Sequence, residues 1–213
     1  MAQTITLAKA LAPRAQTPQN LLHLLNLELC RGNDSCMFVT LLCGLLDTGS
    51  GDLVLASAGH EPPILCGRGA PQLLEFPTGA VLGLYEDSTY PEHRLRLRTG
   101  ETLLMYTDGI TEASDHEQQM YGIERTVESL VQVPSTATTA GYIERLLGDV
   151  DHFVADAAQA DDITLLALTW HGTGVPATGI DIDNRLPDVF VALDRCEQLL
   201  QEAKVPASLH GDV

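Results

Sequence analysis

The sequence contains few basic residues and no long apolar run, and these two shortages exclude several classes of protein. Only 12 of the 213 residues are Lys or Arg, against 29 Asp or Glu, so the formal net charge is −17. A protein that binds a nucleic-acid backbone needs a basic surface, which this composition does not provide. No apolar run approaches the roughly 20 residues of a membrane-spanning helix, and Met1 is not followed by the regions of a secretory signal. We therefore expect no nucleic-acid partner and no membrane partner.

Cysteine is scarce and irregularly spaced. The five cysteines form no Cys-x-x-Cys pair, and an odd number cannot all pair within one chain. Neither a zinc site nor a disulfide framework is expected. Cys43 and Cys66 lie in apolar runs, where a free thiol packs like a small hydrophobic side chain. The pattern favours a reducing, cytoplasmic location.

The chain is nevertheless apolar enough to fold. Hydrophobic residues make up 45% of it and charged residues 19%, which rules out an intrinsically disordered chain and provides for one sizeable core. The acidic residues are unevenly placed, since 20 of the 29 follow residue 100. They either form a solvated acidic surface or include a few ligands of a hard divalent cation. Only the local motifs can separate these two interpretations.

Helical and β-type segments are separated by clear turn signals. Residues 2–12 are rich in Ala and Leu and predict a helix, and Thr17-Pro18 supplies the N-cap and first-turn proline of a second helix that runs to Cys30. The pattern further predicts helices over residues 121–131 and 138–156, and strands over residues 37–46, 53–58, 63–66, 73–76, 94–98, 103–107 and 163–170. Strands that mostly precede helices, with hairpin-length turns, favour an α+β fold with antiparallel sheets.

Residues 171–178 are rich in Gly and Pro and predict a linker. Beyond it, residues 179–184 resemble a strand, and residues 187–203 predict a helix with one apolar side. A segment of this length cannot close a core of its own. We therefore divide the chain into residues 1–170, a linker, and a fragment over 179–213 that is either an appendage of the first domain or the start of a second one.

Two acidic motifs are candidates for chemistry. The apolar strand over residues 103–107 presents Asp108 at its end, where a carboxylate can bind a metal ion, and Gly109 lets the backbone turn sharply beside it. The alternative is that Asp108 only caps a turn. Asp161 and Asp162 directly precede the last apolar strand. Adjacent side chains of an extended chain point to opposite faces, so at most one of them serves a given site directly. The alternative for this pair is a solvated loop end.

A third candidate is His60, at the corner after the strand over residues 53–58 and before two prolines. A histidine that titrates near neutral pH can donate to a phosphate or transfer a proton. The alternative is a corner histidine bonded to the backbone. The residue types alone do not separate these two roles.

Several motifs occur together in a fixed order. They are Phe38-Val-Thr-Leu41, Ala58-Gly-His-Glu-Pro-Pro63, Gly83 with its apolar flanks, Gly100-Glu-Thr-Leu-Leu-Met-Tyr-Thr-Asp-Gly-Ile-Thr-Glu112, Tyr121-Gly122 and Asp161-Asp-Ile-Thr164. In this order they resemble the SpoIIE-like branch of the metal-dependent type 2C Ser/Thr protein phosphatases. The resemblance covers about residues 1–170. It is specific because it rests on the order of several motifs.

The resemblance implies an α-β-β-α sandwich of two antiparallel sheets and two Mg²⁺ or Mn²⁺ ions between them. Asp108 and Asp161 would be metal carboxylates and catalytic residues, with Gly109, Asp162 and His60 in supporting positions. The implied activity is hydrolysis of a phosphoprotein such as an anti-sigma-factor antagonist, in a bacterial signalling pathway. The family also allows for a homodimer.

The sequence departs from the family at its beginning. The Gly-Asp-aromatic-aromatic-Asp segment and the Gly-Asp-Val-Ser-Gly-Lys-Gly segment, which carry the other half of the metal centre, are not found. Gly211-Asp212-Val213 matches the first three residues of the second segment, but it lies at the C-terminal end of the sequence, and we interpret it as a chance match. We therefore expect the sandwich to lack its N-terminal strands, and the chain alone to bind metal weakly and hydrolyse phosphoserine poorly. The alternative is a non-catalytic module that binds such a partner without hydrolysis.

The C-terminal fragment has a resemblance of its own. Ile180-Asp-Ile-Asp-Asn-Arg185, followed by Pro187 and the predicted helix, resembles the opening of an anti-sigma-factor-type histidine-kinase-like ATPase domain. The nucleotide-binding helix of that family would follow Val213, so no ATP site is assigned.

Overall fold

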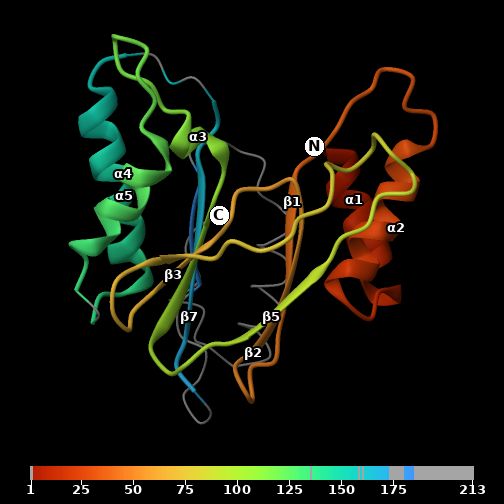
Figure 1. The fold of residues 1–213 in the computed structure, drawn as a ribbon, viewed down its shortest axis with the longest axis horizontal. Coiled ribbons are helices and arrows are strands. Elements are labelled where there is room, and N and C mark those ends of the chain that lie inside the picture. Colours follow the sequence, from red (N-terminus) through yellow and green to blue (C-terminus); the bar gives the residue numbers. More distant parts are fainter. Residues whose placement is uncertain (1, 135, 158, 160, 173–179, 185–213) are drawn as a thin grey trace, which may run out of the picture.

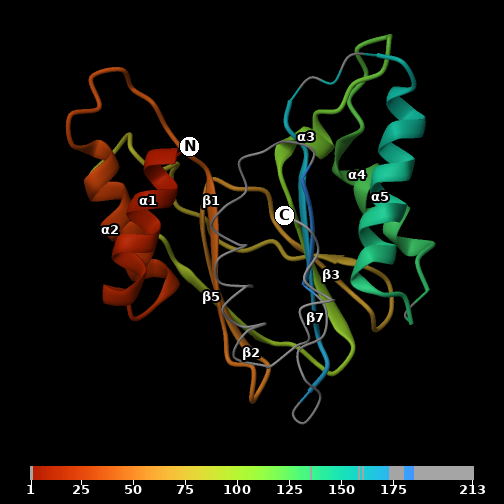
Figure 2. The ribbon, with the colours of Figure 1, turned by 180° about the vertical axis from the view of Figure 1, so that it is seen from behind.

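The computed structural model describes residues 2–134, 136–157, 159, 161–172 and 180–184. Two antiparallel sheets lie face to face, and helices cover the outer side of each sheet (Figure 1). The reverse view shows the same order of layers, helices, sheet, sheet and helices (Figure 2). The predicted α+β class and α-β-β-α sandwich are therefore confirmed.

The first sheet has three strands in the order β1-β2-β5, which are Leu41–Leu46, Asp52–Ala58 and Glu92–Arg96. The β1–β2 hairpin closes through the Asp47 amide, which donates to the Asp52 carbonyl at 2.8 Å. The strand predicted from residue 37 begins only at Leu41. Within residues 37–40, Val39 forms an isolated antiparallel β-bridge with Leu82.

The second sheet has the order β4-β3-β6-β7-β8. Its strands are Gln72–Leu73, Ile64–Cys66, Glu101–Tyr106, Thr164–Trp170 and Ile180–Asn184. The backbone of β8 pairs with β7, from Thr164 opposite Asn184 to Leu168 opposite Ile180. The domain boundary at residue 179 stays a prediction, and the helix predicted over residues 187–203 lies outside the described residues.

Two pairs of helices form the outer layers. Helices α1 (Ala2–Leu11) and α2 (Pro18–Cys30), with a 3-10 turn at Ala12–Arg14 between them, cover the first sheet, and α4 (Gly122–Val131) and α5 (Thr139–Val154) cover the second (Figure 1). The hydroxyl of Thr17 accepts the Asn20 amide at 3.2 Å, as expected of an N-cap. Among the described residues, no helix is both long and apolar enough to cross a membrane.

Three apolar clusters hold the layers together. One lies between α1, α2 and the first sheet, and includes Leu22, Leu25 and Leu82. The second joins the inner faces of the two sheets through Leu53, Leu55, Leu97 and Leu103. The third and largest packs α4 and α5 on the second sheet through residues such as Leu104, Leu146 and Leu165. Because every strand bordering the candidate acidic motifs contributes to one of these clusters, the strand ends are firmly placed.

The cysteines of the described residues are free thiols in contrasting surroundings, and this predicts their reactivity. Cys36 is exposed and Cys66 is buried, and burial raises the pKa of Cys43 to about 11 and that of Cys66 to about 12. Since the thiolate is the reactive form, iodoacetamide at pH 8 is expected to alkylate Cys36 first and to spare Cys43 and Cys66 until the chain unfolds. Peptide mass spectrometry measures this, and equal labelling of Cys36 and Cys66 in the folded protein would contradict it.

Candidate functional site

The two acidic motifs meet at one edge of the second sheet. Strands β6 and β7 are antiparallel, with Tyr106 opposite Leu165, so the end of β6 lies beside the start of β7. The Thr107 amide donates to the Thr164 carbonyl at 3.1 Å, and the Thr164 amide donates to the Thr107 hydroxyl at 3.0 Å. That hydroxyl in turn donates to the Asp162 carbonyl at 3.0 Å. Thr107 thus ties the segment that carries Asp108 to the one that carries Asp161 and Asp162.

Gly109 strengthens this junction in a way that differs from the sequence prediction. It lies in the one-turn helix α3 (Asp108–Thr111), where the Ile110 amide donates to the Thr107 carbonyl at 3.1 Å, so the chain does turn beside Asp108, but without a left-handed backbone at Gly109. An ideal Cβ at Gly109 would lie 2.4 Å from the Asp162 carbonyl oxygen, which is closer than real Cβ atoms approach. Glycine is therefore needed because two backbones touch here, and this contact keeps Asp108 beside the Asp161–Asp162 loop.

The carboxylates themselves face solvent. Asp108, Asp161 and Asp162 are all exposed. One oxygen of the Asp161 side chain accepts the Asp162 amide at 2.7 Å, and the Asp161 carbonyl accepts the Gln159 side-chain amide at 2.7 Å. The Asp108 carbonyl accepts the Glu112 amide at 2.8 Å. Local bonds therefore hold the backbone of both motifs while their side chains stay accessible to a ligand.

His60 lies on the segment that crosses from β2 in the first sheet to β3 in the second. Its main-chain amide donates to the Ser57 hydroxyl at 3.2 Å, and its imidazole Nδ1 lies 3.3 Å from the side-chain hydroxyl of Thr40. Burial lowers the pKa of the His60 imidazole, and the charge of Asp108 acts in the opposite direction. The neutral form therefore prevails near pH 7, and His60 lies within electrostatic range of Asp108.

Glu61 was not singled out from the sequence, yet it faces the same region. Burial raises the pKa of its carboxyl, and the negative charges of Asp108 and Glu112 raise it further. Its charge also acts on Tyr106, whose buried hydroxyl has no hydrogen-bond partner in the structure. The signal that could have identified Glu61 is an acid placed at a corner between two sheets. Its acidic neighbours are about fifty residues away in sequence, so spacing alone does not reveal them.

The carboxylate oxygens of this site are the type of ligand that hard cations prefer, but too few of them come together to hold one. Mg²⁺ and Mn²⁺ prefer carboxylate and water oxygens. Across the part of the chain that the structure describes, no three His, Cys, Asp or Glu side chains come together closely enough to hold a metal ion. The residues present therefore do not fit a complete metal centre by themselves.

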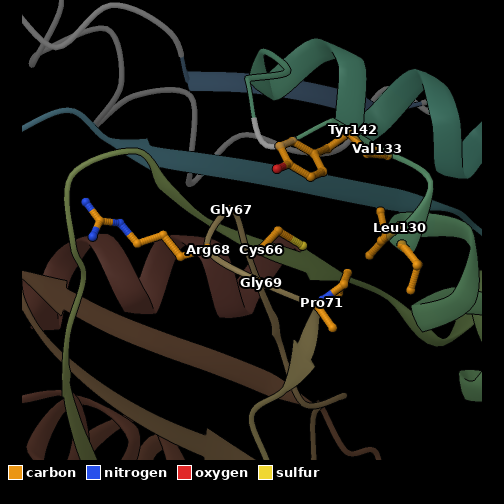
Figure 3. A pocket seen from close by; sticks show the side chains of 10 residues that line it. Cys66, Gly67, Arg68, Gly69, Pro71, Leu130, Val133 and Tyr142 are labelled. Carbon is orange, nitrogen blue, oxygen red and sulfur yellow. The ribbon is translucent and has the colours of Figure 1, made fainter.

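A cavity of about 610 Å³ lies away from these residues (Figure 3). It is bounded by the β3–β4 hairpin, with Cys66 and Arg68, and by the helical layer, with Leu130 and Tyr142. Cys66 pairs with Thr102 near the start of β6, whereas Asp108 follows the end of that strand. The cavity is therefore at the opposite end of the second sheet and is not part of the acidic site.

Comparison with known proteins places this arrangement in a family. The family described as Stage II sporulation protein E (SpoIIE) matches residues 1–171. The chain belongs to the SpoIIE family. Among similar proteins, the chain is 36% identical over 138 residues to Protein IcfG of Synechocystis sp.; the aligned region covers 63% of this chain and 21% of IcfG. It is 28% identical over 96 residues to Phosphoserine phosphatase RsbU of Bacillus subtilis, which covers 45% of this chain and 29% of RsbU.

A solved structure agrees with the SpoIIE assignment at the level of the fold. The SiaA-PP2C domain of Pseudomonas aeruginosa superposes with a TM-score of 0.65 at 18% identity, over 78% of this chain and 67% of that domain. The aligned region spans less than a third of the length of either IcfG or RsbU.

Proposed function

We propose that this chain forms the larger, C-terminal part of a metal-dependent protein Ser/Thr phosphatase domain. The observation that carries the proposal is the junction of Thr107 and Gly109 with Asp162, which brings Asp108 and the Asp161–Asp162 loop to one sheet edge in a SpoIIE-family fold. The antiparallel pairing of β6 with β7 brings the two motifs to one edge, but it does not require that each of them carry an exposed carboxylate there. A site that uses both carboxylates accounts for this placement.

In this proposal Asp108 and Asp161 are metal carboxylates, and the remaining ligands come from segments that the chain does not contain. When bound, Mg²⁺ or Mn²⁺ supplies Lewis-acid polarisation of the phosphoryl oxygens and lowers the pKa of a bound water. The chain's own contribution is positional. Thr107 and Gly109 hold the two motifs together, and Asp162 supports Asp161 from the neighbouring position.

His60 has a role that is compatible with this site. Its imidazole is held through Thr40 and lies within electrostatic range of Asp108. A neutral imidazole can donate one hydrogen bond to a phosphoryl oxygen without adding charge. We assign His60 to orienting the phosphate.

The name of one relative supports a substrate class for the proposal. RsbU is named a phosphoserine phosphatase, and we infer the same class of substrate here, a phosphorylated protein such as an anti-sigma-factor antagonist. The net charge of −17 suits a protein partner better than a nucleic acid. The proposal places the reaction in the cytoplasm of a bacterial cell and allows for a homodimer.

One observation favours a second candidate, a module that binds the phosphoprotein without hydrolysing it. The absence of a three-carboxylate group among the described residues is what a pseudophosphatase would also show. The two candidates differ in what happens when the other acidic segments are supplied.

The test compares the 213-residue chain with a fusion that carries the family's two Gly-Asp segments ahead of Met1. With Mn²⁺ and a phosphoserine peptide, the chain alone is expected to release phosphate at least about 100-fold more slowly than the fusion. A folded fusion that binds Mn²⁺ and releases no phosphate would favour the binding module. Family-typical turnover by the chain alone would show that the described carboxylates suffice.

A further inference from the structure

Two neighbouring loops expose a cluster of large apolar side chains. Met37 and Phe38 lie on the loop between α2 and β1, and Leu84 and Tyr85 lie on the segment between β4 and β5. Phe38 is 61% exposed and Tyr85 is 62% exposed. Of the large apolar side chains that are exposed within the described residues, more than half belong to these four, which we call the apolar platform. Apolar side chains that are exposed next to one another mark interaction sites, whereas single scattered ones do not.

The side-chain amides of Asn26, which is buried, and Asn33, which is half-buried, hold the two loops that carry the apolar platform. Asn26 of α2 is fully buried, donates to the Tyr85 carbonyl at 2.7 Å and accepts the Gly83 amide at 2.8 Å. Asn33 donates to the carbonyls of Met37 and Gly83, at 2.6 and 2.9 Å. Because a buried and fully bonded polar group makes its surroundings rigid, Asn26 fixes the loop of Gly83 and Tyr85, and Asn33 ties the loop of Met37 to it.

The rim of the apolar platform is acidic. Asp34, Glu86 and Asp87 are exposed on the same two loops. No Lys or Arg occurs between Arg31 and Arg68 or between Arg68 and Arg94, and Arg31 is itself paired with Glu28 at 2.5 Å. This charge repels an anionic membrane, and a second copy seated on the same surface would bring two acidic rims together. A protein segment with apolar side chains flanked by Lys or Arg is complementary to it.

Contacts connect the loops of the apolar platform to the His60 corner. Phe38 is two residues from Thr40, whose hydroxyl lies 3.3 Å from His60 Nδ1. An ideal Cβ at Gly59, next to His60, would lie 2.7 Å from a methyl group of Val81, so the segment leading to Leu84 packs against the His60 corner. Both loops lie on the α1–α2 side of the molecule (Figure 1).

We propose that the apolar platform docks a basic and apolar segment of the phosphoprotein substrate, next to its phosphorylated residue. This inference rests on the proposed function for the identity of the partner. Docking itself needs only the platform, so it is measurable without hydrolysis. Exposed aromatic residues on a rigid support are typical anchors of such contacts.

The experiment uses the 213-residue chain and a short fluorescein-labelled peptide that contains Leu, Phe and several Lys around an unphosphorylated Ser. Fluorescence anisotropy is expected to show saturable binding that weakens at high salt. Phe38→Ser and Tyr85→Ser should each weaken it about tenfold. A peptide with Glu in place of Lys should bind at least about tenfold more weakly, because it meets the acidic rim.

The matched control is Val131→Ser, which removes an apolar side chain of similar exposure, 51%, from the end of α4 in the opposite helical layer. It should leave binding unchanged. Equal binding by Phe38→Ser, Tyr85→Ser and the original chain would overturn the proposal. So would a dimer that these variants dissociate, because the platform would then belong to a second copy. A chain that docks the peptide while the fusion releases no phosphate would refute the proposed function and leave the docking surface intact.

Discussion

Replacing Gly109 with Ala is expected to lower the free energy of unfolding by about 2–3 kcal/mol. The new Cβ would lie 2.4 Å from the Asp162 carbonyl oxygen and 2.9 Å from the carbonyl carbon. Both atoms belong to the backbone, so no side-chain rotation relieves the contact. Either α3 or the Asp161–Asp162 loop must move, and the hydrogen bond from the Thr107 hydroxyl to the Asp162 carbonyl would lengthen. Urea unfolding followed by circular dichroism measures the change.

The matched control is Gly148→Ala in α5. Both glycines are helical, but an ideal Cβ at Gly148 meets nothing within 4 Å. Helix propensity alone should therefore stabilise Gly148→Ala by roughly 0.5–1 kcal/mol. Gly109 is buried in a one-turn helix and Gly148 is exposed in a long one, and only at Gly109 does the new Cβ meet backbone atoms, so the opposite sign of the two changes reports the close approach to Asp162. If both variants were stabilised alike, the backbone contact would not be the reason for glycine at position 109.

The order of the acidic motifs and the strands beside them was predictable from the sequence, because each depends on local pattern. The apolar run before Asp108 predicts a strand that ends at an exposed carboxylate. The apolar run after Asp162 likewise predicts a strand, β7, that begins just after an exposed carboxylate. The contact between the two motifs was not predictable in this way. It depends on the antiparallel register of β6 and β7 and on the missing side chain at Gly109, whose partner is more than fifty residues away.

Residues with distant partners were missed for the same reason. Asn26 interrupts the apolar side of α2 and would be placed at a solvated position by pattern alone, yet it is fully buried between α2 and the loop that contains Gly83 and Tyr85. Its two partners are 57 and 59 residues away. Glu61 was part of a recognised motif, but its proximity to Asp108 follows only from the crossing between the two sheets.

Strand ends were displaced where the chain leaves one sheet for the other. Alternation predicted a strand over residues 94–98, whereas β5 spans Glu92–Arg96. Arg and Leu alternate over residues 94–98, and the polar Glu92 and His93 before them are both half-buried, so alternation marks neither end of β5. The Leu97 amide donates to the Gly51 carbonyl at 2.9 Å, and the chain then turns through Thr99 and Gly100 into β6. Tertiary contacts at the crossing, rather than local propensity, determine where pairing stops.

Asp108→Asn and Asp161→Asn, each introduced into the fusion that carries the family's Gly-Asp segments, are expected to lower phosphate release by about 10³-fold or more. Asparagine keeps the size and one oxygen of the side chain but removes the negative charge that a divalent cation requires. Isothermal titration with Mn²⁺ should show a parallel loss of affinity. The fold should survive, because both side chains are exposed and no apolar contact is removed.

Two further variants test whether the loss of turnover comes from removing a metal ligand or only from removing a negative charge. Glu128→Gln removes one negative charge from the exposed surface of α4 and should leave turnover within about twofold. Asp162→Asn should cost about 10- to 100-fold, which is typical of a residue that supports a ligand. The discriminating result is a loss of turnover that is largest for Asp161→Asn, smaller for Asp162→Asn and smallest for Glu128→Gln. An Asp162 variant that loses more activity and more Mn²⁺ affinity than the Asp161 variant would exchange the two roles, since adjacent side chains of an extended segment cannot both face one ion.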